Sequence, residues 1–150
     1  MATPPPRDVA VDAAVELLVP APGGPPVLDP ARSPAAAERL GALVAEELRA
    51  TGVDAVLTWE EDGGAAVLGH ITARELGAPR VAVREDLGRL LGDVDRLRGL
   101  RAGLAALTEP APRVLDPLRR LVSSHDGEIV ATAVAVRPAE LDEATRRARG

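Results

Sequence analysis

The sequence predicts an α/β fold, a parallel sheet with flanking helices, and three observations support this prediction. Short apolar runs alternate with helical patterns along most of the chain. The clearest alternation spans Val53–Arg84, which is typical of a strand, an acidic glycine turn, a helix and a second strand. A crossover of this kind makes its two strands parallel. At 150 residues the chain is expected to form one domain, residues 9–150, after a proline-rich tail at 1–8 that we expect to be disordered.

The Val53–Arg84 stretch divides at residues with clear structural preferences. Val53–Thr58 is an apolar run led by β-formers, and Arg80–Arg84 is a second one. Between them, Ala65–Leu76 contains helix formers and is followed by a glycine and a proline, which end helices. Ligands of open α/β sheets bind at the carboxyl ends of the strands. The turn Trp59–Gly64 is therefore the first candidate site.

Before this unit the sequence predicts two helices and one short extended piece. Apolar residues within Val11–Leu18 fall on one face of a short helix. Val27–Asp29 follows a Pro/Gly loop and is extended at most briefly. Ser33 is a suitable N-cap with proline after it, so a longer helix is expected over Pro34–Ala50.

After the unit the pattern is weaker at first and then clear again. Glu85–Arg98 fits an irregular loop, a hairpin or a broken helix, and the choice stays open. Ala102–Leu107 predicts a tightly packed strand, and Asp116 followed by proline predicts a helix start. Glu128–Val136 is the strongest predicted strand, and Pro138–Arg149 predicts a terminal helix that frays.

Composition excludes several classes of function. The absence of cysteine rules out disulfides, thiolate catalysis and zinc-thiolate sites. All 18 basic residues are arginine, so no lysine Schiff base can form, and His70 and His125 are too few for a histidine metal site. A net charge of -5 argues against nucleic-acid binding. No apolar run approaches the roughly 18 residues of a membrane helix, and a cytoplasmic location is expected.

The central stretch resembles the type I phosphoribosyltransferases, the family that includes the orotate and adenine enzymes. Glu61-Asp62-Gly63-Gly64 stands in place of the family's Glu-x-Gly-Gly pyrophosphate loop, and Val83-Arg84 in the position of a Val-Arg-Lys. The likeness covers roughly Val27–Val136. It implies the Rossmann-like phosphoribosyltransferase type I fold, phosphoribosyl pyrophosphate and Mg²⁺ as the ligands of an active member, and a homodimer.

The family's defining signature is altered in this sequence. The signature is a strand ending in two acidic residues, followed by a Thr/Gly-rich loop that wraps the 5-phosphate. The resemblance places it at about Gly103–Val114, where the loop glycines are missing and Pro110 and Pro112 each remove a backbone N–H. We expect Asp116 to cap the next helix with its carboxylate, which would block phosphate there. The positions of the degenerate loop are Leu107, Thr108, Glu109 and Arg113.

The retained positions each allow a functional and a purely structural interpretation. The acidic turn could hold Mg²⁺ through waters, but a solvated turn is the simpler interpretation, so no metal ligand is assigned. Trp59 occupies the pocket floor, where the family usually has a small residue, and is expected to fill the pocket rather than stack on a base. Arginines near the site could bind phosphate, or could pair with the surplus carboxylates. The candidate pyrophosphate- or anion-binding residues are Glu61, Asp62, Gly63, Gly64 and Arg84.

The leading hypothesis is a degenerate phosphoribosyltransferase-like protein, a non-catalytic binding or assembly module without cofactor or catalytic residue. One alternative is an active orotate or purine phosphoribosyltransferase, in which Glu61 and Asp62 organise Mg²⁺-pyrophosphate and Arg113 replaces the lost loop. The other is a nucleotide-sensing regulatory protein. The expected partners are a second copy of the chain and a nucleotide or phosphorylated small molecule, with no role for nucleic acid or membrane.

Overall fold

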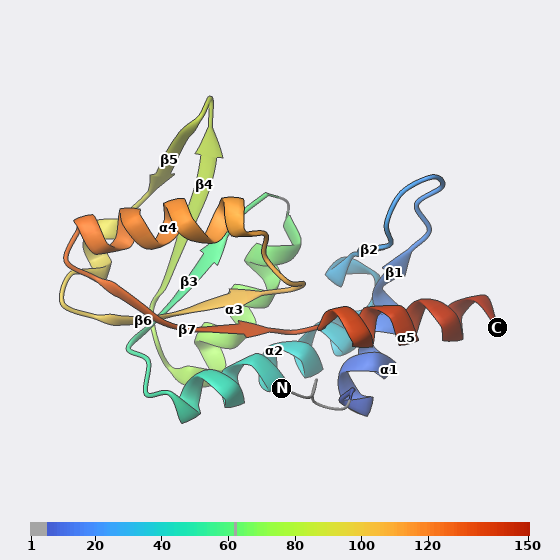
Figure 1. Cartoon of the computed structure of the whole chain (residues 1–150). Helices are drawn as coiled ribbons and strands as arrows, with labels where there is room; N and C mark the ends of the chain where they lie inside the picture. Colours follow the sequence, from blue (N-terminus) through green and yellow to red (C-terminus); the bar gives the residue numbers. More distant parts are fainter. Residues whose placement is uncertain (1–5, 62) are drawn as a thin grey trace, which may run out of the picture.

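The structure is a computed structural model that describes residues 6–61 and 63–150. A five-stranded sheet in the order β5-β4-β3-β6-β7 forms its centre and is flanked by helices (Figure 1). Four of these strands run parallel, and β5 is antiparallel to β4. The predicted α/β class is therefore confirmed. The strands are β3 (Ala55–Trp59), β4 (Arg80–Asp86), β5 (Arg89–Gly92), β6 (Arg101–Ala106) and β7 (Glu128–Val134).

Helices cover both faces of the sheet. Helices α2 (Pro34–Ala50) and α3 (Gly63–Leu76) pack together on one face. Helix α4 (Pro112–Ser124) and the 3-10 helix η2 (Val94–Leu97) lie on the other face. The sheet is thus the middle of three layers, which positions the carboxyl ends of β3 and β6 beside the start of α4 (Figure 1).

The elements near the two termini form a group of their own beside the sheet. Helix α5 packs against α1, and α1 packs against α2 (Figure 1). A two-stranded antiparallel sheet of β1 and β2 belongs to the same group. The terminal helix is therefore docked against the fold. The bounds are α1 (Asp8–Leu17), β1 (Leu18–Val19), β2 (Val27–Leu28), the 3-10 helix η1 (Pro30–Arg32) and α5 (Pro138–Arg149).

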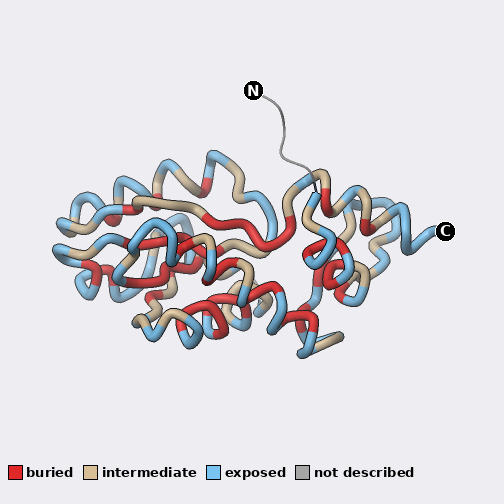
Figure 2. Tube along the Cα trace, turned by 90° about the horizontal axis from the view of Figure 1, so that it is seen from below, coloured by how far each residue is buried: buried red, intermediate tan, exposed pale blue. Residues whose placement is uncertain are grey.

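The core is built almost entirely from Ala, Val and Leu because the chain has one aromatic residue. Central strand β3 is buried on both faces: Val56 faces the cluster with α1 and α2, whereas Ala55 and Leu57 face the cluster under α4. Figure 2 shows buried residues along the strands and on the inward sides of the helices. Gly41 lets α2 approach α3, since a Cβ there would lie 2.2 Å from Cγ2 of Ile71.

The predicted tail needs one correction at its end. The backbone N–H of Arg7 donates to Oε2 of Glu140 at 2.7 Å, and α1 begins at Asp8. These two residues, which the sequence placed in the disordered tail, therefore belong to the folded domain. Pro6 is exposed and has no regular secondary structure, and the rest of the predicted tail, residues 1–5, lies outside the described residues.

The segment left open by the sequence, Glu85–Arg98, is a hairpin followed by η2. Strands β4 and β5 pair around a two-residue turn at Leu87 and Gly88. Both turn residues have positive φ, 50° and 78°, as the turns that fit strand twist require. The hairpin projects away from the body of the molecule (Figure 1).

Candidate functional site

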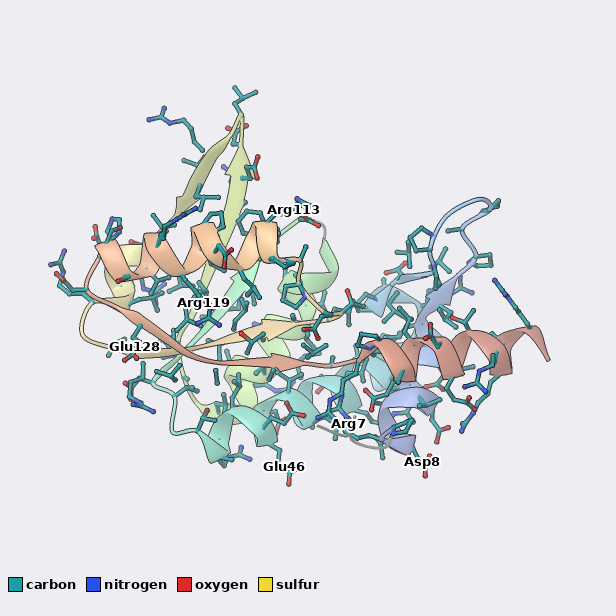
Figure 3. All side chains as sticks on the ribbon, viewed as in Figure 1. Arg7, Asp8, Glu46, Arg113, Arg119 and Glu128 are labelled. Carbon is teal, nitrogen blue, oxygen red and sulfur yellow. The ribbon has the colours of Figure 1, made fainter. Side chains whose placement is uncertain are left out.

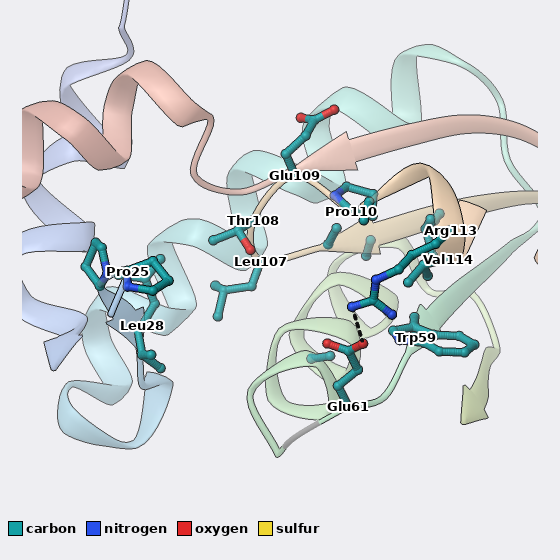
Figure 4. A pocket seen from close by; sticks show the side chains of 17 residues that line it. Pro25, Leu28, Trp59, Glu61, Leu107, Thr108, Glu109, Pro110, Arg113 and Val114 are labelled. Atoms are coloured by element: carbon teal, nitrogen blue, oxygen red, sulfur yellow. Dashed lines mark ion pairs between the residues drawn. The ribbon is translucent and has the colours of Figure 1, made fainter. Parts of the chain in front are cut away.

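The carboxyl ends of β3 and β6 open into a cleft of about 470 Å³. Its opposite wall is the segment 25–28, which includes β2, and the first turn of α4 closes a third side (Figure 4). Segments far apart in the sequence thus meet where an α/β sheet commonly binds ligands. The lining comprises Pro25, Pro26, Val27, Leu28, Trp59, Glu61, Ala65, the segment 104–111, Arg113 and Val114.

The end of β3 is held in place by an arginine from the neighbouring strand. Nη1 of Arg80 donates to Oγ1 of buried Thr58 at 3.0 Å and to Oε1 of Glu60 at 2.7 Å. This ion pair engages Glu60, the first carboxylate of the acidic turn, whereas the next carboxylate, Glu61, lines the cleft. The sequence offered no signal for Arg80, because its partners lie 20 and 22 residues earlier in the chain.

Two carboxylates and one guanidinium are the charged groups among the described residues of the cleft lining. Glu61 and Arg113 point toward each other, with Oε1 and Nη2 3.8 Å apart (Figure 4). Both side chains are largely exposed, at 58% and 74%. Glu109 comes from the loop after β6 and points away from this pair (Figure 4). Within the described lining the ionised side chains therefore carry more negative than positive charge.

The loop after β6 is held in place by apolar packing and backbone bonds. Leu107 is partly buried against the core cluster, and its carbonyl accepts a hydrogen bond from the N–H of Val136 at 2.9 Å. Thr108 and Glu109 are exposed. Pro110 and Ala111 complete the loop and carry the chain back to the start of α4.

Helix α4 starts one turn earlier than the sequence predicts. Its N-cap is Ala111, its first residue is Pro112, and Asp116 lies inside the helix with its side chain exposed. The predicted cap at Asp116 is therefore wrong, because an extended alanine followed by proline starts the helix instead. No side chain caps this end. The first turn thus faces the cleft without a carboxylate on its N–H groups.

Trp59 packs against the core beneath α4 and forms part of the cleft wall. It is partly buried with that cluster and lies near Arg113 and Val114 (Figure 4). Its indole Nε1 is buried and has no hydrogen-bond partner among the described residues. The tryptophan does not fill the cleft, which stays open beside it.

The other predicted site residues are only partly brought together. Gly63 and Gly64 are the first two residues of α3, and Gly63 has free space where a Cβ would be. Neither packing nor a positive φ requires glycine at position 63. Arg84 lies on β4 in a separate pocket with Glu60 and Leu91. The predicted role of Asp62 falls outside the described residues.

The described part of the chain contains no group of three or more acidic or histidine residues placed to hold a metal ion. In the same residues, no helix is both long and apolar enough to span a membrane. The sequence missed the wall formed by segment 25–28, because a Pro/Gly loop carries no sign of which distant strand end it will face.

Comparison with solved structures identifies the architecture. The structure of adenine phosphoribosyltransferase from Rhodothermus marinus matches with a TM-score of 0.69 and 18% identity, over 93% of this chain and 93% of that one. This chain has the type I phosphoribosyltransferase fold. The orotate phosphoribosyltransferase of Mycobacterium tuberculosis H37Rv, in complex with inorganic phosphate, matches with a TM-score of 0.64 and 15% identity, over 90% of this chain and 98% of that one.

A third structure of the phosphoribosyltransferase fold contains ligands of the reaction. The adenine phosphoribosyltransferase of Trypanosoma brucei, in complex with AMP, pyrophosphate and ribose-5-phosphate, has a TM-score of 0.67 and 13% identity, over 93% of this chain and 72% of that one. No family model matches the sequence, and no curated protein matches it. The likeness at these identities is one of fold.

Proposed function

We propose that this chain is a phosphoribosyltransferase-fold protein that no longer transfers phosphoribose and serves as a binding or assembly module. The observation that carries the proposal is the charge of the cleft. Phosphoribosyl pyrophosphate is a polyanion, and proteins hold such groups with cations, metal ions and free backbone N–H groups. Here Glu61 and Glu109 outnumber Arg113 among the described charged residues of the lining, and Arg113 is paired with Glu61.

The loop after β6 supports the same proposal. Proline at 110 and 112 supplies no N–H at two positions next to the cleft. Leu107 packs against the core, where the resembling family has an acidic residue. A glycine-rich loop can wrap a phosphate with successive N–H groups, and this loop has lost that capacity at two positions.

We place the protein in the cytoplasm as a homodimer, without nucleic acid or membrane as a partner. If the cleft binds a ligand, we expect a nucleotide or a phosphorylated small molecule. The first turn of α4 has no side-chain cap, but Pro112 has no N–H and the N–H groups of Val114 and Leu115 donate to the carbonyl of Ala111, so the N–H of Arg113 is what this turn offers to an anionic group.

A pyrophosphate-release assay tests the loss of activity. The protein is incubated with phosphoribosyl pyrophosphate, Mg²⁺ and a panel of bases that includes adenine and orotate. We expect no release of pyrophosphate above a protein-free control for any base. Turnover of one base would overturn the proposal.

An active nucleobase phosphoribosyltransferase is the second candidate, favoured by the open cleft and the uncapped start of α4. In this candidate Glu61 and Asp62 organise Mg²⁺-pyrophosphate and Arg113 neutralises phosphate charge. Phosphoryl-bearing substrates need positioning and charge neutralisation more than a covalent group. Should turnover be found, Glu61→Ala and Arg113→Ala must both lower it, whereas Glu46→Ala, an exposed change on α2, must not.

A nucleotide sensor without chemistry is the third candidate, and the size of the cleft favours it. A ligand that binds only the folded state raises the melting temperature as its concentration rises. A thermal-shift series with AMP, UMP and GMP should show this rise for one nucleotide and lose it in Arg113→Glu. A flat series for all three nucleotides would remove the sensor from consideration.

A further inference from the structure

We infer that β5 pairs antiparallel with β5 of a second copy of this chain, about a two-fold axis that passes through Leu91. The inference names the surface of the homodimer proposed above and rests on that proposal. It is independent of the cleft and of any ligand. The two edges of the sheet, the register of the hairpin, and the charges of Arg89 in β5 and Asp93 directly after it carry it.

The two edge strands of the main sheet are treated differently. Arginines bind backbone carbonyls near both ends of β7: Nη2 of Arg7 donates to the carbonyls of Val134 and of Ala135, just beyond the strand, and Nη1 of Arg119 donates to that of Ile129. Figure 3 shows these two arginines reaching the strand from different elements. No such bond to β5 occurs among the described residues. An uncovered edge strand is a template for another strand.

The direction of the backbone groups of β5 follows from the neighbouring strands. The carbonyl of Val83 accepts a bond from the N–H of Glu60 at 2.8 Å, so the polar groups of Val83 face β3. Because these groups alternate along a strand, those of Arg84 face β5, where Arg84 lies opposite Leu91. The polar groups of Leu91 therefore face β4.

Because of this alternation, the backbone N–H and C=O groups of Leu90 and Gly92 point away from β4, toward the open edge of the sheet. β5 is the last strand on this side, so these two residues have no strand partner in the described chain. Each presents one N–H and one C=O at the open edge. A second β5 running in the opposite direction can pair with all four groups.

Only one register satisfies both the backbone and the charges. When Leu90 lies opposite Gly92 of the second copy, the outward backbone N–H and C=O groups of the two chains face each other. Leu91 then lies opposite Leu91 of the second copy. The same register places Arg89 opposite Asp93 of the second copy, twice in the dimer. Opposite charges and apolar side chains facing each other across strands stabilise the pairing. A register centred on Leu90 pairs no opposite charges, and one centred on Gly92 places Arg89 opposite Asp95, which lies in η2 and not in an extended segment.

The side chains along this edge are available for such pairing. Arg89 and Asp93 are exposed, and neither forms an ion pair among the described residues. Leu91 is 37% exposed, and Leu87 at the hairpin tip is 96% exposed. Pairing in this register would bring the hairpin tip toward the start of η2 in the second copy. It would therefore cover apolar side chains that the single chain leaves in water.

Charge exchange between two chains gives a sharp test. Arg89→Asp and Asp93→Arg are made separately in the full chain, and each places like charges opposite one another across the axis. In an equimolar mixture of the two variants, every facing pair again carries opposite charges. Sedimentation velocity over a range of concentrations measures the dimer dissociation constant of each sample. Arg120→Asp, an exposed change on α4 without a described ion pair, is the matched control.

We expect the wild type and the control to dimerise with the same dissociation constant. Each single variant should raise it by about tenfold, since two facing pairs turn from attractive to repulsive, and the mixture should recover the dimer. The amide protons of Leu90 and Gly92 should also exchange more slowly as wild-type concentration rises. Circular dichroism confirms that each variant is folded.

Two outcomes would overturn the inference in distinguishable ways. A wild type that stays monomeric at every concentration contradicts both the homodimer and the β5 surface, and leaves Arg89 as a charge that keeps the edge apart. A dimer that neither single variant weakens keeps the homodimer and contradicts only the β5 surface.

Discussion

Arg7 and Arg113 both pair with carboxylates from other elements, but their surroundings differ. The side chain of Arg7 is 20% exposed and forms ion pairs with Glu140 at 2.8 Å and Glu47 at 2.9 Å, besides its bonds to two carbonyls of the β7 end. Arg113, at the cleft, is 74% exposed and has one partner, Glu61, at 3.8 Å. The first arginine joins several elements of the fold, whereas the second is exposed and has a single distant partner.

The surroundings of Arg7 and Arg113 show which part of the fold is held together by ion pairs. The Arg7 network joins α1, α2, α5 and the end of β7, and so fixes the group of elements that includes β2. Strand β2 forms one wall of the cleft. The β2 wall of the cleft therefore belongs to a group of elements joined by a partly buried ion-pair network, while Arg113 is the one cation among the described residues of the cleft lining. This contrast is what the proposed loss of transferase activity rests on.

Removing the central arginine should have the largest effect. Arg7→Ala leaves the carboxylate of Glu140, whose side chain is 1% exposed, without its partner. Breaking a buried pair from one side typically costs about 3–5 kcal/mol of the free energy of unfolding. Urea unfolding measures this cost. Arg113→Ala serves as the control and should cost less than about 1 kcal/mol, because exposed ion pairs contribute little. Equal costs for the two variants would remove the contrast between these sites.

The support beneath the cleft gives the next largest effect. A Cβ at Gly69 in α3 would lie 2.2 Å from Cγ2 of Thr58, the residue that Arg80 holds at the end of β3. Gly69→Ala should therefore destabilise the fold by about 1–3 kcal/mol, as overpacked cores do. The matched control is Gly63→Ala at the cleft end of the same helix, where nothing lies within 4 Å. Differential scanning calorimetry should show a lower melting temperature for the first variant alone.

Acid should weaken the Arg7 network, because Glu140 must stay ionised to pair with Arg7. Burial alone would raise the pKa of Glu140, but hydrogen bonds from the Arg7 side chain and from the backbones of Arg137 and Arg7 outweigh it, so the pKa lies below 4.5. A carboxyl whose pKa is lowered by folding stabilises the fold above its unfolded pKa, and this stability is lost as pH falls through the folded value.

The free energy of unfolding should accordingly decrease as pH is lowered below about 4.5. Glu140→Gln should flatten this dependence, whereas Glu46→Gln, an exposed change on α2, should leave it unchanged. Chemical unfolding at a series of pH values measures both slopes. Identical slopes in wild type and Glu140→Gln would show that Glu140 does not provide the acid sensitivity.

Much of the fold could be predicted from local patterns, because those patterns are independent of distant contacts. The apolar run ending at Thr58 and the glycine and proline after Leu76 fix the central crossover, and the structure confirms it. The start of α4 was missed because Asp116 with its proline is a better local cap signal than Ala111 with its own. The helix nevertheless begins at Pro112, and Val114 in its first turn is buried.

The candidate site was predictable only where it lies on the crossover. The acidic turn and Trp59 follow β3 directly, so their place at the cleft follows from the strand. Arg7 was assigned to a tail because three prolines precede it. Its partner Glu140 lies 133 residues further along the chain. Contacts of that separation leave no local periodicity in the sequence.

The most direct test of the central claim is a calorimetric titration of the full chain with phosphoribosyl pyrophosphate and Mg²⁺. A cleft with fixed walls but too few cations should give no saturable heat at millimolar ligand. Saturable binding with a dissociation constant in the micromolar range, abolished by Arg113→Glu, would contradict this account. It would show that the cleft still gathers enough positive charge to hold the ligand.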